Sequence, residues 1–392
     1  MARTFTIATL GGIAIQARMS AGVAFLILFW FLATLALPNQ LVTPIGERPS
    51  NITLWSLAFI STLSLYFSTI VHELGHALVA RARKIEAPTI SVNLFGGHAN
   101  IQEDDQGPLD EFFISISGPL VSLVIAAVTA ACIKFIPNQS PPLELFLFAL
   151  CLLNIWLAIY NLLPAPPLDG GRALRGLLWH FRGDALWATN GAVMVGRVFA
   201  FVMASASVVM LLFSSVLMRS ELLPPALVAD GRIPILGLFL AWMLNNGARS
   251  FQRNAVIQQR LVGVTVGRVM STNPQCVPPW TSLEEIADNH LKGDRAPAVA
   301  IVRGDDQLMG LVAYSDVAKV PAKDRPNRTA GEIMTAASAL ITVSPDDPVE
   351  VAIRHMAQRH LNQLPVVADG KLVGMVDRKN IIQLTEPSAR RI

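Results

Sequence analysis

The sequence predicts a polytopic α-helical membrane protein, with about six transmembrane helices and a membrane-associated β-hairpin, followed by a soluble α/β pair of repeats. Three observations support this fold class. Hydrophobic residues make up 52% of the 392 residues and charged residues only 15%, a balance that soluble enzymes of this length rarely show. Apolar runs of helix length recur through residues 1–250. From about residue 263 the pattern changes to short strands and helices that contain an internal repeat.

Six apolar runs are expected to cross a bilayer. They are residues 21–37, 52–79, 112–136, 145–163, 192–218 and 233–246. Arginine and lysine residues flank alternate ends of these runs, which by the positive-inside rule places the N- and C-termini in the cytoplasm. We therefore expect a multi-pass protein of the cell membrane in contact with the lipid bilayer, with a linker helix at 251–262. The net charge of +3 is small and distributed, so direct binding of nucleic acid is not expected.

The second run contains the segment Val71–His76, which reads VHELGH. On a helix, His72 and His76 lie one turn apart on the same face and can bind one Zn²⁺, while Glu73 lies where it can take a proton from bound water. Ionisable groups are costly inside a span unless they are paired or bound, so a metal site is favoured over a structural polar cluster. At 1.5 Å per residue, the nine residues from His72 to Arg81 place the metal about 13 Å inside the cytoplasmic interface.

A third ligand is expected after the fourth run, where Asn161–Arg172 reads NLLPAPPLDGGR. Three prolines end the helix, and Gly170-Gly171 lets the chain turn sharply after Asp169. Irregular backbone at membrane depth is tolerated only where it lines a protein cavity. Catalytic zinc sites use three protein ligands and leave one position for water, and Asp169 with an ionised Glu73 balances the charge of the ion. The alternative for Asp169 is a helix cap or an ion pair with Arg172.

Residues 90–101 alternate on either side of Gly96-Gly97, which predicts a β-hairpin with its turn at these glycines. The free edge of this hairpin can hold an extended peptide beside the metal, which makes Gly96 and Gly97 candidate substrate-binding positions. The alternative is a hairpin that only covers the site. Gly118-Pro119 is expected to kink the third span and to pack near the site. Residues 13–17 alternate as a short strand at the membrane surface.

The soluble region repeats with an offset of 64 residues. Gly267–Met270 recurs as Gly331–Met334, and Gly310–Val312 recurs as Gly374–Val376. Each unit predicts strand, helix, strand, strand and helix, so the two units, at about 263–325 and 326–392, should stack as a pseudo-symmetric pair.

Together these motifs resemble the site-2 protease family of intramembrane zinc metalloproteases, in the subgroup with a tandem cystathionine-β-synthase (CBS) domain pair. HELGH followed by NLLP and PLDGG, in this order, carries the resemblance. The resemblance implies that Glu73 is the general base and that Asn161 helps to hold the substrate or the oxyanion. The alternative for Asn161 is an amide that satisfies backbone freed by Pro164. The metal ligands implied are His72, His76 and Asp169.

The resemblance further implies cleavage of a transmembrane or membrane-associated protein, often a transcription regulator such as an anti-sigma factor, within or near the bilayer. Nucleotide-binding CBS units usually carry Thr or Ser three residues before an Asp that contacts the ribose. Here Ala313 precedes Asp316, and Asp377 precedes Asn380. Asp316 is thus the candidate for binding an adenine nucleotide, and a dimerising or gating function of the CBS pair, including a homodimer, is an equal alternative. A CBS-regulated transporter or channel is the alternative from another functional class.

Overall fold

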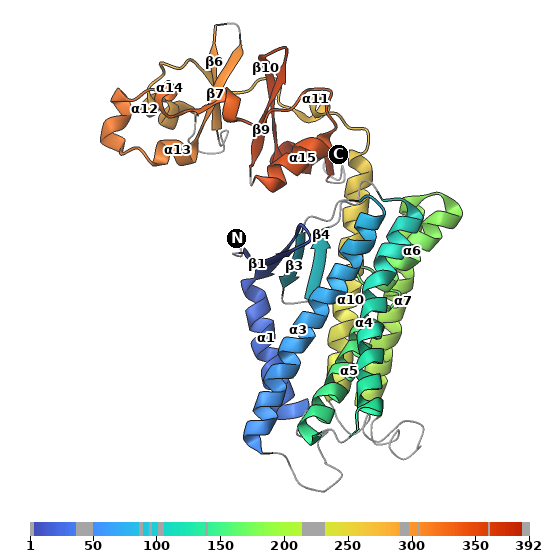
Figure 1. Cartoon of the computed structure of the whole chain (residues 1–392). Helices are drawn as coiled ribbons and strands as arrows, with labels where there is room; N and C mark the ends of the chain where they lie inside the picture. Colours follow the sequence, from blue (N-terminus) through green and yellow to red (C-terminus); the bar gives the residue numbers. More distant parts are fainter. Residues whose placement is uncertain are drawn as a thin grey trace. The chain divides into compact units, whose positions relative to one another are not determined.

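The computed structural model describes residues 4–36, 50–85, 89–93, 96–100, 106–137, 140–213, 232–290, 298–304, 306–359 and 361–385. The chain forms two compact units, Met1–Arg253 and Asn254–Ile392 (Figure 1). The first unit holds the apolar helices and a small sheet, and the second holds the repeats.

The described helices of the first unit follow the predicted apolar runs except for α6, which none of those runs predicts. They are α1 (Met19–Phe31), continued by a π-helix at Leu32–Ala36, α3 (Asn51–Ala82), α4 (Pro108–Phe135), α5 (Pro141–Asn161), α6 (Asp169–Arg182), α7 (Ala185–Leu212) and α10 (Arg232–Leu261). Among the described residues, α3, α4, α5 and α7 are long and apolar enough to cross a membrane. The first and sixth predicted spans are helical, in α1 and α10, but the count of six stays a prediction. Residue 37 and residues 214–218 of the predicted spans lie outside the described residues.

Helix α3 carries small and polar residues on its inner face and large apolar residues on its outer face. Ser61, Thr62 and Ser68 are buried, whereas Phe59 and Phe67 are 47% and 66% exposed. This distribution suits a helix in lipid, because apolar side chains there gain nothing from burial and small residues allow helices to pack closely.

A four-stranded sheet lies against the second half of α3. Its strands are β1 (Thr4–Leu10), β2 (Ile13–Arg18), β3 (Thr89–Asn93) and β4 (Gly96–Asn100), in that order, with β2 and β3 parallel and the other pairs antiparallel. Ile13 and Ile90 pack with Ala77 and Ala80 of α3 in one buried cluster. The predicted strand at residues 13–17 is confirmed as β2, and the predicted hairpin is confirmed as β3 and β4.

The predicted turn of the hairpin was wrong. Asn93 pairs with Gly96 and Val92 pairs with Gly97, so both glycines belong to β4 and the connection falls at residues 94–95, outside the described residues. The alternating pattern of residues 90–101 does not fix which residues pair across the hairpin. Glycine occurs in turns and also in strands that another backbone approaches closely, so the pattern does not decide between the two places for Gly96-Gly97.

The second unit contains a mixed sheet in the order β5–β6–β7–β10–β9, with β8 paired to β7. The strands are β5 (Cys276–Val277), β6 (Ala298–Arg303), β7 (Gln307–Ala313), β8 (Thr335–Ala336), β9 (Gln363–Ala368) and β10 (Lys371–Asp377). The helices are α11 (Val266–Val269), α12 (Leu283–Glu285), α13 (Tyr314–Ala318), α14 (Ala330–Ile333), α15 (Val349–Gln358) and α16 (Arg378–Thr385), with a π-helix at Ile286–His290 and 3-10 turns at Ala322–Asn327 and Ala337–Ala339. Strands β7 and β10 begin 64 residues apart, as the repeat predicts.

The two repeats exchange their first helices. Val266 and Val269 of α11 pack in one core with Val349 and Val376 of the second repeat. Conversely, Ala330 of α14 packs in the other core, against residues of the first repeat. Gly310 and Gly374 sit at equivalent crossings: a Cβ at Gly310 would lie 2.9 Å from Met334 Sδ, and one at Gly374 would lie 2.8 Å from Met270 Sδ. The predicted pseudo-symmetry therefore includes an exchange that the repeat boundaries do not reveal.

Candidate metal centre

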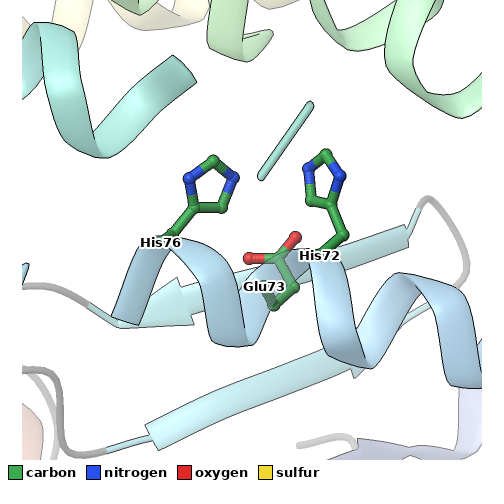
Figure 2. A group of neighbouring side chains, drawn as sticks. All are labelled: His72, Glu73 and His76. Carbon is green, nitrogen blue, oxygen red and sulfur yellow. The ribbon is translucent and has the colours of Figure 1, made fainter. Parts of the chain in front are cut away.

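Helix α3 places three ionisable side chains at one buried point. His72 and His76 project from the same face, and Glu73 lies between them on the helix (Figure 2). The imidazole centroids are 5.0 Å apart, and ligand atoms of all three residues lie within 4.8 Å of one another. Each residue is less than a tenth exposed. The helical spacing predicted from VHELGH is the spacing observed.

Asp169 comes to the same point from the first turn of α6. Its Oδ2 atom lies 3.1 Å from His72 Nε2 and 3.3 Å from His76 Nε2. Arg172, the alternative partner considered for Asp169, instead faces Glu111 on α4, with 4.0 Å between Nε and Oε1. The structure thus brings together the four residues that the sequence predicted, from segments almost one hundred residues apart.

The segment before Asp169 explains why two glycines follow it. Gly170 and Gly171 lie in the first turn of α6, so they do not provide the sharp turn that we predicted. A Cβ at Gly170 would overlap the backbone at Leu162, and one at Gly171 would overlap the backbone at Pro166. Their function is close approach: without side chains, the start of α6 can lie directly on the segment that follows α5.

Helix α4 orients both imidazoles through their outer nitrogens. His76 Nδ1 lies 2.6 Å from the carbonyl oxygen of Ile114. A carbonyl oxygen can only accept, so Nδ1 carries a proton, which leaves Nε2 as the ring nitrogen that is available to bind a metal ion. His72 Nδ1 lies 2.9 Å from the Ser122 hydroxyl. Hydrogen bonds of this kind fix the ring orientation and tautomer of metal-binding histidines.

Gly118 of α4 keeps the space beside the imidazoles open. A Cβ there would lie 2.6 Å from His72 Nε2 and closer still to His76 Nε2. The prediction that Gly118-Pro119 packs near the site is therefore confirmed. No pattern in the sequence indicates Ser122 or the Ile114 carbonyl, because their part in the site depends on how α3 packs against α4.

A buried ion cluster joins the first turns of α4 and α6. Glu111 is 2% exposed, and its Oε1 accepts a hydrogen bond from Arg175 Nη1 at 2.9 Å. Arg172 Nε lies 4.0 Å from the same Glu111 oxygen. Because Asp169 begins the same helix as the two arginines, the cluster fixes the helix that presents the carboxylate to the histidines.

The side chain of Asn161 forms a hydrogen bond within its own helix. Its amide donates to the carbonyl of Leu157 at 3.0 Å, one turn earlier in α5. Asn154, on the same helix, is fully buried and donates to Ser68 Oγ at 3.1 Å, one turn before His72. Asn154 was not predicted, since a single amide in an apolar run carries no positional signal.

The two remaining groups of predicted residues lie at a strand edge and at a helix cap. Gly96 and Gly97 begin β4, which pairs only with β3 within the described sheet, so its outer edge has no strand partner there. In the second unit, Asp316 Oδ2 accepts a hydrogen bond from Ala313 N at 3.2 Å, and Oδ1 accepts one from Lys319 Nζ at 3.0 Å. Asp316 therefore caps α13.

The donor set fits a zinc ion. One carboxylate oxygen lies within 3.3 Å of two imidazole nitrogens, Gly118 leaves room beside them, and hydrogen bonds to α4 hold both rings. Catalytic zinc sites are built from three protein ligands of these types.

Comparison with known proteins agrees with this donor set. Residues 60–144 and 138–205 match Peptidase family M50, and residues 266–323 and 330–386 match the CBS domain. The putative zinc metalloprotease sll0528 of Synechocystis is 28% identical over 349 residues, covering 86% of this chain and 85% of that protein.

Two further relatives extend the comparison. The putative zinc metalloprotease Rip3 of Mycobacterium tuberculosis is 28% identical over 365 residues, covering 92% of this chain and 88% of that protein. The solved site-2 protease from Methanocaldococcus jannaschii is 25% identical, covering 64% of this chain and 95% of that one, with a TM-score of 0.39. Because the two family models match one after the other along the chain, residues 60–205 and then residues 266–386, the chain belongs to the site-2 protease family of zinc metalloproteases, Peptidase family M50, and carries a tandem pair of CBS domains.

Proposed function

We propose that this protein hydrolyses peptide bonds of transmembrane or membrane-associated proteins within or near the bilayer, as an intramembrane zinc metalloendopeptidase. One observation carries the proposal: the Asp169 carboxylate on α6 lies 3.1 and 3.3 Å from the Nε2 atoms of His72 and His76 on α3. These three residues would hold the zinc ion. Glu73 would be the catalytic base, because its carboxylate shares their buried space.

The zinc ion that His72, His76 and Asp169 would hold would supply Lewis acidity at this point. Glu73 would take a proton from the attacking water and later pass it to the leaving amine. The carbonyl of Ile114 and the hydroxyl of Ser122 hold the imidazoles so that their Nε2 atoms stay directed at one point. Burial keeps bulk water away from these groups and strengthens each of their electrostatic interactions.

The substrate is proposed to bind as an extended strand along β4, beginning at Gly96 and Gly97. A transmembrane helix hides its carbonyls in its own hydrogen bonds, so it must unwind before cleavage, and the outer edge of β4 offers backbone partners for the unwound segment. Substrates with helix-destabilising residues near the cut are therefore expected to be cleaved fastest. Asn161 is proposed to approach the substrate only after a rotamer change, because its amide now donates to Leu157.

For regulation, we propose that the CBS pair senses a ligand or a second copy of the chain, with the termini in the cytoplasm. An adenine nucleotide that contacts Asp316 would share a carboxylate that already caps α13. A homodimer formed through the CBS pair is the alternative. The natural substrate is proposed to be a membrane-bound regulator of transcription, of the anti-sigma factor class.

The test compares membrane proteomes of cells that express the wild type or Glu73→Gln. Cells with the Glu73→Gln variant should accumulate an uncleaved membrane precursor. The control is Glu144→Gln, which changes an exposed glutamate at the start of α5 and should cause no accumulation. Zinc analysis of the purified chain adds a second readout, since His72→Ala and Asp169→Ala should lose the ion. Wild-type cleavage by Glu73→Gln would refute the catalytic assignment. Ion flux through the purified chain in vesicles, without cleavage, would favour the transporter alternative.

A further inference from the structure

Helices α7 and α10 enclose a groove that the proposed reaction does not use. Its volume is about 670 Å³. At one end the helices touch closely, since a Cβ at Gly237 would overlap the Ser207 hydroxyl. At the other end, Gln252 Nε2 donates a hydrogen bond to Asn190 Oδ1 at 2.7 Å. The helices thus meet at both ends and separate between them.

The groove is basic near one end and apolar along the rest of its length. Arg197 of α7 and Arg249 of α10 are exposed and line it near the Asn190–Gln252 contact. Beyond them, Phe201 and Trp242 form walls that are 72% and 61% exposed. No acidic side chain is among the described residues that line the groove, so its positive charge has no protein counter-ion there.

This combination points to an amphipathic anion. Arg197 lies inside a helix that is apolar enough to cross a membrane, and a guanidinium in such a place is costly unless it reaches the interface or binds an anion. Two guanidinium groups match the oxygens of a phosphate. Free inorganic phosphate would leave the apolar walls uncovered, whereas a phospholipid would cover them with an acyl chain.

We propose that the groove binds an anionic phospholipid, with its phosphate between Arg197 and Arg249 and an acyl chain along Phe201 and Trp242. The proposal does not depend on the catalytic assignment. The bound lipid would also support the metal centre's framework, because both helices pack on the segment before Asp169. A Cβ at Gly196 of α7 would lie 2.8 Å from Ala165 Cα, and one at Gly247 of α10 would lie 2.7 Å from Pro167 Cδ.

The test uses the full chain in nanodiscs of phosphatidylcholine, with or without phosphatidylglycerol, followed by native mass spectrometry after transfer to detergent. The wild type should retain phosphatidylglycerol selectively. The double variant Arg197→Gln/Arg249→Gln should retain at least about tenfold less phosphatidylglycerol than the wild type. The double variant in which both arginines become lysine should recover part of this loss. Arg253→Gln is the matched control, since it removes a charge from the same helix outside the groove.

Thermal unfolding in phosphatidylcholine alone should be unchanged in these variants, which shows that they fold. With phosphatidylglycerol, the wild type should gain stability that the double Gln variant does not gain. If the wild type and the double Gln variant retain the same amount of phosphatidylglycerol, the proposal is wrong. It is also wrong if Arg253→Gln loses as much phosphatidylglycerol as the double Gln variant, because binding would then depend on surface charge in general. Displacement of the lipid by an apolar helical peptide that crosslinks to position 242 would assign the groove to a peptide instead.

Discussion

Replacing Gly118 with alanine tests whether α4 sets the geometry of the metal centre. The added Cβ would lie 2.6 Å from His72 Nε2 and still closer to His76 Nε2. Real Cβ atoms essentially never approach heavy atoms below 3.0 Å. Either the imidazoles or the helix must therefore move away from the point where the ligand atoms converge.

The expected size of the effect follows from that distance. Ordinary contact begins at 3.4 Å, so the Cβ and the His72 imidazole must separate by about 0.8 Å, whereas metal–ligand distances tolerate about 0.2 Å. Losing one outer hydrogen bond of a ligand typically costs about 10–100-fold in metal affinity. A displacement of the ligands themselves is expected to cost at least about 100-fold, or about 2.7 kcal/mol.

The fold should suffer much less than the metal site. Overpacking costs about 1–3 kcal/mol, and replacing a helical glycine with alanine returns up to about 1 kcal/mol. The metal-free protein is thus expected to unfold within about 2 kcal/mol of the wild type.

Competition with a zinc chelator measures the affinity of the detergent-purified chain, and thermal unfolding with and without the metal measures the fold. Gly22→Ala on α1 is the control, because nothing lies within 4 Å of its Cβ position. A Gly118→Ala chain that binds zinc as tightly as the wild type would refute the reasoning.

Three further substitutions have defined outcomes. Ser122→Ala removes the hydrogen bond to His72 Nδ1 and should lower zinc affinity about tenfold by chelator competition, with cleavage falling in parallel. Glu111→Ala leaves Arg175 without its buried partner and should destabilise the chain by about 3–5 kcal/mol in thermal unfolding, whereas Glu111→Asp should recover part of this loss. Gly310→Ala should lower the free energy of unfolding by about 1–3 kcal/mol, because the added Cβ would overlap the Thr335 carbonyl. Gly304→Ala should leave it unchanged in the same thermal unfolding assay, because nothing lies within 4 Å of its Cβ position.

Local periodicity predicted the parts of the site that one helix or one motif defines. The spacing of His72 and His76 fixes their common face on any α-helix, and the prolines before Asp169 mark the break between α5 and α6. Packing between helices was not predictable in this way. Ser122 is one hydroxyl in an apolar helix, and only the contact of α3 with α4 places it 2.9 Å from His72 Nδ1. No pattern in the sequence around Glu111 predicts that this carboxylate is buried.

The glycines show the same division. Gly118 lies near the site, as predicted. The prediction was possible because a Gly-Pro pair is itself unusual inside an apolar span. Gly96-Gly97 and Gly170-Gly171 were assigned to turns, yet they occur in a strand and in a helix. A glycine permits both a sharp turn and a close approach, and choosing between them requires the neighbouring segment, which a single sequence does not place.

Helix α4 is the element through which distant parts of the chain reach one point. Its Ile114 carbonyl and Ser122 hydroxyl hold the two imidazoles of α3, while Glu111 at its start holds Arg175 of α6, the helix that begins with Asp169. Because ligand positions must agree within a few tenths of an ångström, a rigid third helix bonded to both is what allows residues 72, 76 and 169 to act as one centre.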